Sequence, residues 1–136
     1  MKELRFTLEE PAKRNFGAAK KNKRETGSDY EEKAAGFLQS CGYTILEKNY
    51  RIRTGEIDLI VRDRKYLVFC EVKYRADKRV DTALEAVDQK KQMKIINTAR
   101  YYLMRHPSLE NLLIRFDVIG INRYGHIEHI QNAFEE

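Results

Sequence analysis

The stretch from Tyr66 to Lys73 limits the fold of this 136-residue chain more than any other feature. It is a strongly apolar run with aromatic and β-branched members, which is typical of a central strand. The end of the run departs from this pattern, because Glu71 and Lys73 are charged. Side chains alternate along a strand, so these two share one face while Cys70 and Val72 share the other. The sequence therefore predicts a central strand that carries two charges on one face near its end.

A second strand precedes the central one and brings another carboxylate toward it. Residues 56–61 alternate between polar and apolar side chains, and the polar turn at residues 63–65 joins them to the central strand. Counting outward from Arg64 sets Asp58 opposite Cys70 or Glu71, so the carboxylates of Asp58 and Glu71 are expected to converge. Alternation also predicts that Asp58 faces away from the apolar side chains of its strand, which are Ile57, Leu59 and Val61.

The rest of the chain predicts helices around a small sheet. Apolar residues at helical spacing predict a helix over residues 28–40, ended by Gly42, and a capping box at residues 82–85 predicts a long helix that ends before Pro107. Further strands are predicted at residues 43–52 and 113–121, with a short edge strand at 125–130. The fold class is therefore α/β (α+β), a mixed sheet of four to five strands flanked by helices.

Most of the net charge of +5 lies in the first 26 residues. We interpret residues 1–26 as a flexible basic arm in front of a single domain over residues 27–136. A basic arm can attract a phosphate backbone through counterion release, although a solvated disordered tail has the same composition. The nucleic-acid-binding candidates in the arm are Lys20, Lys21, Lys23 and Arg24.

Targeting signals and metal-binding cysteine patterns are not evident in the sequence. The chain has no run of eighteen apolar residues and is charged from Lys2 onward, so no membrane contact is expected and a cytoplasmic location is predicted. Cys41 and Cys70 lack a CxxC spacing and are expected to be reduced thiols. The histidines also lack metal-ligand spacing and are assigned no role; they are His106, His126 and His129.

Asp58, Glu71 and Lys73 form the candidate catalytic site. Phosphodiester hydrolysis uses hard oxygen ligands to hold Mg²⁺ (or Mn²⁺), and two converging carboxylates supply them. The ammonium of Lys73 can position the attacking water or stabilise charge on the phosphoryl oxygens. An ordinary salt bridge on a solvated sheet face is the alternative, but charges at the end of a buried strand often mark a site.

Glu31 is a candidate fourth member of the site. It lies three, four and seven residues before Ala34, Ala35 and Leu38, and so shares the helix face that should pack on the sheet. The segment from Ser28 to Glu31 is also a capping box, in which Glu31 would only close back on the backbone amide of Ser28. The pattern supports a metal-ligand role and a capping role about equally.

Lys91 and Gln92 are candidate nucleic-acid-binding residues near the start of the long helix. Lys91 lies four residues after Val87 and four before Ile95, on or beside the apolar stripe of the helix. From there its ammonium can reach a phosphate. A lysine that extends its charged end to solvent from the edge of a packed face is the more common outcome of this pattern.

Several segments taken together resemble one bacterial family. They are Gly55-Glu56-Ile57-Asp58-Leu59-Ile60, Phe69-Cys70-Glu71-Val72-Lys73, Ala83-Leu84-Glu85-Ala86-Val87 with Lys91-Gln92, and Arg115-Phe116-Asp117-Val118. This succession resembles the uncharacterised YraN family over residues 27–134. Glu31 ahead of Ala34-Ala35, the Gly42-Tyr43 pair and Asn49-Tyr50-Arg51 also match.

The YraN family is similar to the restriction-endonuclease-like superfamily, which includes archaeal Holliday-junction resolvases. The resemblance implies that fold, and it implies Asp58, Glu71 and Glu31 as metal ligands with Lys73 as a catalytic residue; the carbonyl of Val72 is a further candidate ligand. The superfamily motif is a proline-aspartate pair followed by a strand with an acidic-x-lysine sequence. Glu71-Val72-Lys73 matches the second half of this motif. In the first half only Asp58 matches, since Ile57 stands where a proline is frequent. Because a fold does not determine a function, the resemblance implies the site more strongly than the reaction.

Two classes of function follow from these residues. The first is a Mg²⁺-dependent endonuclease that hydrolyses DNA, with branched or damaged DNA as candidate substrates and a homodimer as one way to cut two strands. The second is a non-catalytic module that keeps the nuclease scaffold and binds nucleic acid or a protein partner. The first predicts metal-dependent cleavage that needs Glu71 and Lys73, whereas the second predicts binding that depends on the basic arm.

Overall fold

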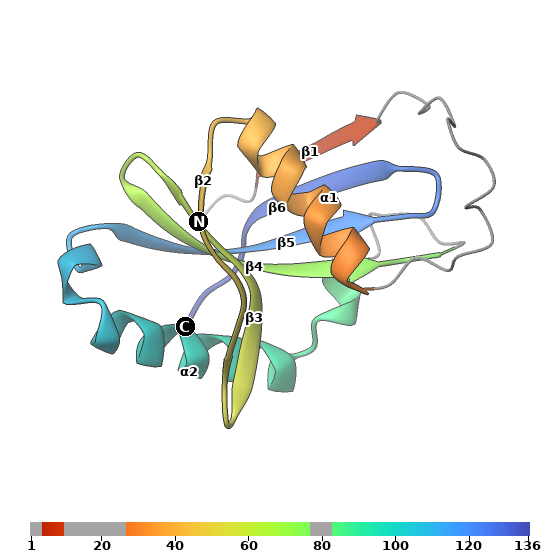
Figure 1. Cartoon of the computed structure of the whole chain (residues 1–136). Helices are drawn as coiled ribbons and strands as arrows, with labels where there is room; N and C mark the ends of the chain where they lie inside the picture. The colour runs from red at the N-terminus through yellow and green to blue at the C-terminus, as the bar shows by residue number, and fades with distance from the viewer. Residues whose placement is uncertain (1–3, 10–26, 77–82) are drawn as a thin grey trace.

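The computed structural model describes residues 4–9, 27–76 and 83–136 (Figure 1). The strands are β1 (Leu4–Glu9), β2 (Thr44–Ile52), β3 (Gly55–Asp63), β4 (Tyr66–Tyr74), β5 (Leu113–Ile121) and β6 (His126–Phe134). The helices are α1 (Gly27–Ser40) and α2 (Gln89–Arg105), with short 3-10 turns at η3 (Leu84–Ala86) and η4 (Pro107–Leu109). The predicted mixed sheet with flanking helices is confirmed.

The strands form one six-stranded sheet in the order β1-β6-β5-β4-β3-β2. Among the described strands, β4 and β5 are the one parallel pair, and α2 makes the crossover between them. The sequence predicted no element at residues 4–9, where β1 pairs with β6. The edge strand predicted at 125–130 is therefore corrected: β6 extends to Phe134 and lies between β5 and β1. Residues 10–26 of the predicted arm lie outside the described residues.

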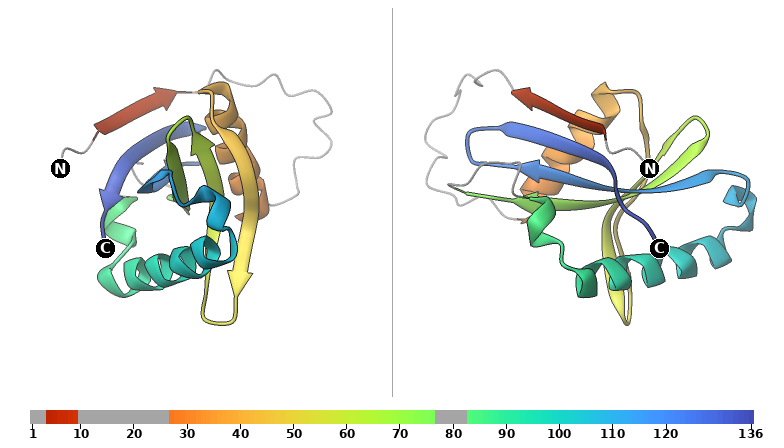
Figure 2. Two further views of the ribbon diagram at one scale, coloured as in Figure 1. Left: turned by 90° about the vertical axis from the view of Figure 1, so that its left-hand side faces the viewer. Right: turned by 180° about the vertical axis from the view of Figure 1, so that it is seen from behind.

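Helices α1 and α2 lie on opposite faces of the sheet (Figures 1 and 2). An apolar core lies between each helix and the sheet. Along β4, Leu67 and Phe69 pack into the core under α2, while Val68 and Cys70 pack into the core under α1. This alternation explains why β4 is apolar from Leu67 to Cys70, since both of its faces are covered there. No helix in the described ranges is long and apolar enough to cross a membrane.

Gly42 ends α1 as predicted. Its φ of 97° lies in the left-handed region that favours glycine. The amide of Tyr43 donates to the carbonyl of Leu38 at 3.0 Å. The amide of Gly42 donates to the carbonyl of Gln39, also at 3.0 Å. These two bonds satisfy carbonyls at the helix end and turn the chain into β2.

The start of α2 differs from the prediction. A capping box at residues 82–85 was expected to open the helix, but residues 84–86 form a 3-10 turn and α2 begins at Gln89. Asp88 is the N-cap, and its carboxylate accepts a 2.9 Å hydrogen bond from the amide of Lys91. Thr82 lies outside the described residues. Asp88 provides the stronger start signal because its short carboxylate both caps the amides and complements the helix dipole.

Candidate active site

The β3–β4 hairpin brings Asp58 and Glu71 together. Leu59 pairs with Cys70, which sets Asp58 next to Glu71 across the two strands, as counting from the turn predicted. The amide of Val72 donates to Oδ2 of Asp58 at 2.8 Å. Both carboxylates are buried, with 6% of Asp58 and 4% of Glu71 exposed. Two acidic groups therefore meet inside the protein and not on a solvated face.

The predicted alternation along β3 is wrong at Ile57. Leu59 and Val61 pack under α1, but Ile57 packs into the core under α2. On β2, Asn49 has a φ of 53° and lies between Lys48 and Tyr50, which pair with Leu59 and Ile57 of β3. A left-handed residue within a strand changes the direction of the strand locally. At this bend Ile57 and Leu59, on either side of Asp58, face opposite sides of the sheet.

Two lysines lie against Glu71. The Nζ atom of Lys91 is 3.3 Å from Oε2 of Glu71, and that of Lys73 is 3.6 Å from the same oxygen. Lys73 comes from β4, as predicted, and Lys91 reaches across from α2. The side chains keep 26% and 38% of their surface exposed, respectively, so each ammonium can contact both the buried carboxylate and solvent.

Glu31 joins the site from α1. Its carboxylate lies close enough to Asp58 and to the side chain of Asn49 for both to shift its pKa. Glu71 likewise shifts the pKa of Asp58. Asp58 thus lies near a carboxylate on each side, and three elements, α1, β3 and β4, each contribute one acid. Asn49 was not predicted as a neighbour of the site; a left-handed asparagine within a strand is unusual, but it becomes evident only from the backbone.

Burial and neighbouring carboxylates raise the pKa values of all three acids. Burial and then the charge of Asp58 raise the pKa of Glu71 to about 7, against the opposing charges of Lys91 and Lys73. The pKa of Asp58 is raised by burial and by the charge of Glu56, against the opposing hydrogen bond from the amide of Val72. The pKa of Glu31 is raised by burial and by Asp58. For Lys91, burial would lower the pKa, but Glu71 outweighs it and the pKa is raised.

The donor set suits a hard divalent cation. Glu31, Asp58 and Glu71 supply carboxylate oxygens, which Mg²⁺ and Mn²⁺ prefer, and a cation among them would relieve their repulsion. Within the described ranges no three acidic, histidine or cysteine side chains already have the spacing of a complete ligand set. The fit therefore rests on the chemistry of these three acids and on their raised pKa values.

Gln92 is the other predicted binding residue that the structure describes, and it contacts the backbone before α2. The side-chain amide of Gln92 donates to the carbonyl of Val87 at 3.0 Å, which ties the start of α2 to the segment before it. The four arm candidates lie outside the described residues; they are Lys20, Lys21, Lys23 and Arg24.

A second buried polar cluster, centred on Asp117 of β5, was missed at the sequence level. Arg115 donates to the two carboxylate oxygens of Asp117 from Nε and Nη2, both at 3.0 Å. His129 of β6, which had been assigned no role, donates from Nε2 at 2.6 Å. The Arg-x-Asp spacing on one strand face was the available signal, but its partner on β6 required the three-dimensional structure.

Comparison with other proteins agrees with the resemblance to the YraN family. The Uncharacterised protein family UPF0102 matches residues 30–121 of the chain. The chain belongs to the UPF0102 family. A UPF0102 protein of Alcanivorax borkumensis is 42% identical over 118 residues, which cover 84% of this chain and 94% of that protein.

Other UPF0102 proteins match to a similar extent. One of Nitrosomonas europaea is 47% identical over 112 residues, covering 81% of this chain and 93% of that protein. One of Lachnoclostridium phytofermentans is 44% identical over 114 residues, covering 84% and 96%. The UPF0102 region runs from α1 to β5 and includes every acid and lysine of the candidate site. The family description assigns no activity.

Proposed function

We propose that this protein is a metal-dependent endonuclease that hydrolyses phosphodiester bonds in DNA. The observation that carries the proposal is the meeting of the partly buried Glu31 with the buried carboxylates of Asp58 and Glu71, with Lys73 and Lys91 against Glu71. Crowded acids removed from water destabilise a fold, and such groups concentrate at functional sites. The resemblance to the restriction-endonuclease-like superfamily supports the same reading.

Each residue has a distinct role in the proposed reaction. Glu31, Asp58 and Glu71 would hold Mg²⁺ or Mn²⁺, and the Val72 amide keeps Asp58 in place from the backbone. The bound cation would polarise the phosphate and lower the pKa of a water molecule. Lys73 and Lys91 place positive charge where the phosphoryl oxygens become more negative. Hydrolysis joins the oxygen of water to phosphorus, and the bridging oxygen leaves with its electron pair and gains a proton.

A cleavage assay tests the proposal. Supercoiled plasmid, linear duplex and four-way junction DNA would be incubated with the protein in Mg²⁺, in Mn²⁺ and in chelator, so that branched and unbranched substrates are compared directly. We expect cleavage that requires the metal and falls at least about a hundredfold in Glu71→Gln and in Lys73→Ala, as for other residues that act in the transition state.

Two neighbouring acids on α1 provide a matched control. Glu31→Gln should lower cleavage, whereas Glu32→Gln should leave it unchanged, because Glu32 is exposed and pairs with Lys48 at 2.9 Å outside the site. Folding of each variant is checked by circular dichroism and thermal unfolding. Cleavage that persists in both Glu71→Gln and Lys73→Ala would overturn the proposed site, and DNA binding without any cleavage would favour a non-catalytic module.

A further inference from the structure

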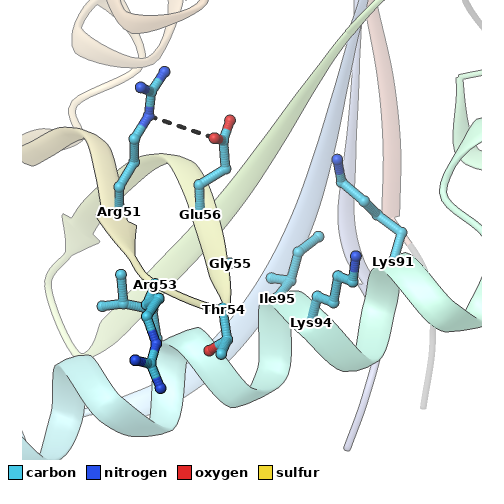
Figure 3. Close-up of a pocket in the computed structure, with 9 residues that line it drawn as sticks. Arg51, Arg53, Thr54, Gly55, Glu56, Lys91, Lys94 and Ile95 are labelled. Carbon is cyan, nitrogen blue, oxygen red and sulfur yellow. Dashed lines mark ion pairs between the residues drawn. The ribbon is translucent and has the colours of Figure 1, made fainter.

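A basic groove lies beside the candidate site, between the tip of the β2–β3 hairpin and the first turns of α2 (Figure 3). Its volume is about 520 Å³. The polar side chains that line it come from both elements: Arg51, Arg53, Thr54 and Glu56 from the hairpin, and Lys91 and Lys94 from α2. Figure 3 shows both lysines rising from α2, with Arg53 lying over the helix.

Positive charge dominates the groove. It has four cationic side chains and one carboxylate, and that carboxylate, Glu56, is paired with Arg51 at 3.4 Å. Arg53 and Lys94 are exposed, and in the described part of the chain neither is paired with a carboxylate. These two cations are therefore available to an anionic ligand without first breaking an ion pair.

Lys91 connects the groove to the candidate site. Its ammonium contacts Glu71 at 3.3 Å while its side chain lines the groove. An extended polyanion in the groove would therefore pass beside Glu71 of the candidate site. The sequence had singled out Lys91 as a phosphate contact, but Arg53 and Lys94 were not predicted because they meet only when the hairpin tip reaches α2.

Close packing fixes the two walls of the groove. A Cβ atom at Gly55 would collide with Oγ1 of Thr98 and lie 3.3 Å from the carbonyl oxygen of Lys94. Only glycine lets the hairpin backbone approach α2 this closely. The hydroxyl of Thr98 also donates to the carbonyl of Lys94 at 2.8 Å, so the contact surface on α2 is itself held in place.

The lining also indicates what part of a nucleic acid would bind. Among the described residues that line the groove none is aromatic, and proteins that hold single strands commonly stack bases on aromatic rings. Lysine and arginine contacts to phosphates position a duplex without reading its sequence. On the basis of the proposed function, we propose that the groove binds the phosphodiester backbone of duplex DNA next to the scissile phosphate, with Arg53 and Lys94 as its main contacts.

Binding measured without cleavage tests the groove separately from the nuclease proposal. Anisotropy of a fluorescent DNA duplex would be titrated in chelator at salt concentrations from about 50 to about 200 mM, where each lost phosphate contact lowers the salt slope by about 0.9. For the double variant Arg53→Gln/Lys94→Gln, we expect affinity to fall on the order of tenfold and the slope to fall by about 2, equally for unrelated sequences.

A charge-matched control separates the groove from general positive charge. Lys65→Gln/Arg105→Gln removes the same charge from exposed positions outside the groove and should bind like the unmodified protein. Equal losses in both double variants, no loss in the groove variant, or a loss confined to one DNA sequence would overturn the proposed groove. If the groove variant alone loses binding while the unmodified protein never cleaves, the groove stands and the nuclease proposal fails.

Discussion

Two buried acidic centres on the same sheet differ in how their charge is balanced. Asp117, under α1, is fully buried and receives hydrogen bonds from Arg115, His129 and the amide of Asn132. Burial alone would raise its pKa, but the bonds from His129 and Arg115 outweigh this and hold the pKa below its ordinary value. Asp117 therefore stabilises the fold as an anion.

In the centre formed by Glu31, Asp58 and Glu71, the pKa values are raised and not lowered. Burial and neighbouring acids raise all three pKa values, although two lysines lie against Glu71. The comparison shows that burial of a carboxylate does not by itself mark a functional site. What distinguishes the centre of Glu31, Asp58 and Glu71 is that its anionic charge exceeds what its own neighbours neutralise, which is the condition that a bound cation would relieve.

Removing Asp117 should have the largest effect on stability. Asp117→Ala leaves the buried Arg115 and His129 without their shared partner, so we expect the free energy of unfolding to fall by about 3–5 kcal/mol. Denaturant unfolding of the purified variant measures it. A loss below about 1 kcal/mol would mean that Asp117 is not a stabilising centre and would remove the contrast between the two regions.

Removing one hydroxyl from the rim of the same cluster should have a smaller effect. Tyr43 Oη accepts hydrogen bonds from Nη2 of Arg115 at 2.6 Å and from Nε2 of Gln131 at 3.2 Å. Tyr43→Phe keeps the ring and loses both bonds, so we expect a loss of about 1.5–3 kcal/mol, typical of a hydrogen bond to a charged group. If the variant were as stable as the unmodified protein, the cluster would not act as a connected network.

Neutralising Glu71 should stabilise the protein. This change in stability should be smaller than those expected for the Asp117 and Tyr43 substitutions. A raised pKa means that the folded state binds more protons than the unfolded state between the ordinary value of 4.5 and about 7, so stability falls as pH rises through that window. Glu71→Gln removes this dependence. Without metal, the variant should gain about 1 kcal/mol relative to the unmodified protein between about pH 5 and about pH 7. A loss that grows with pH would show Glu71 to be a stabilising anion like Asp117.

Much of the candidate site could be predicted because its signals are local. Glu71 and Lys73 interrupt an apolar strand, a short hairpin turn sets Asp58 beside Glu71, and helical spacing turns Glu31 toward the sheet. Each inference needs only the period of one element or one tight turn.

The features that were missed depend on contacts between distant segments or on unusual backbone angles. β1 is held by pairing with β6, more than a hundred residues later in the chain. Beside Asp117, the β5–β6 register shifts, and Asp117 Oδ1 accepts the amide of Asn132, whose φ is 54°. This bulge interrupts the alternation of β6 beyond Ile130, so the sequence pattern does not show that the strand continues to Phe134.

The most direct test of the central claim is metal binding by the centre of Glu31, Asp58 and Glu71. Calorimetric titration of the folded protein with Mn²⁺ should show binding that is weakened at least about tenfold in Glu71→Gln, since loss of one charged ligand costs affinity of that order or more. Tyr43→Phe, which alters only the Asp117 cluster, should bind Mn²⁺ like the unmodified protein. Equal Mn²⁺ affinity in Glu71→Gln and the unmodified protein would contradict the assignment of this centre as a metal site.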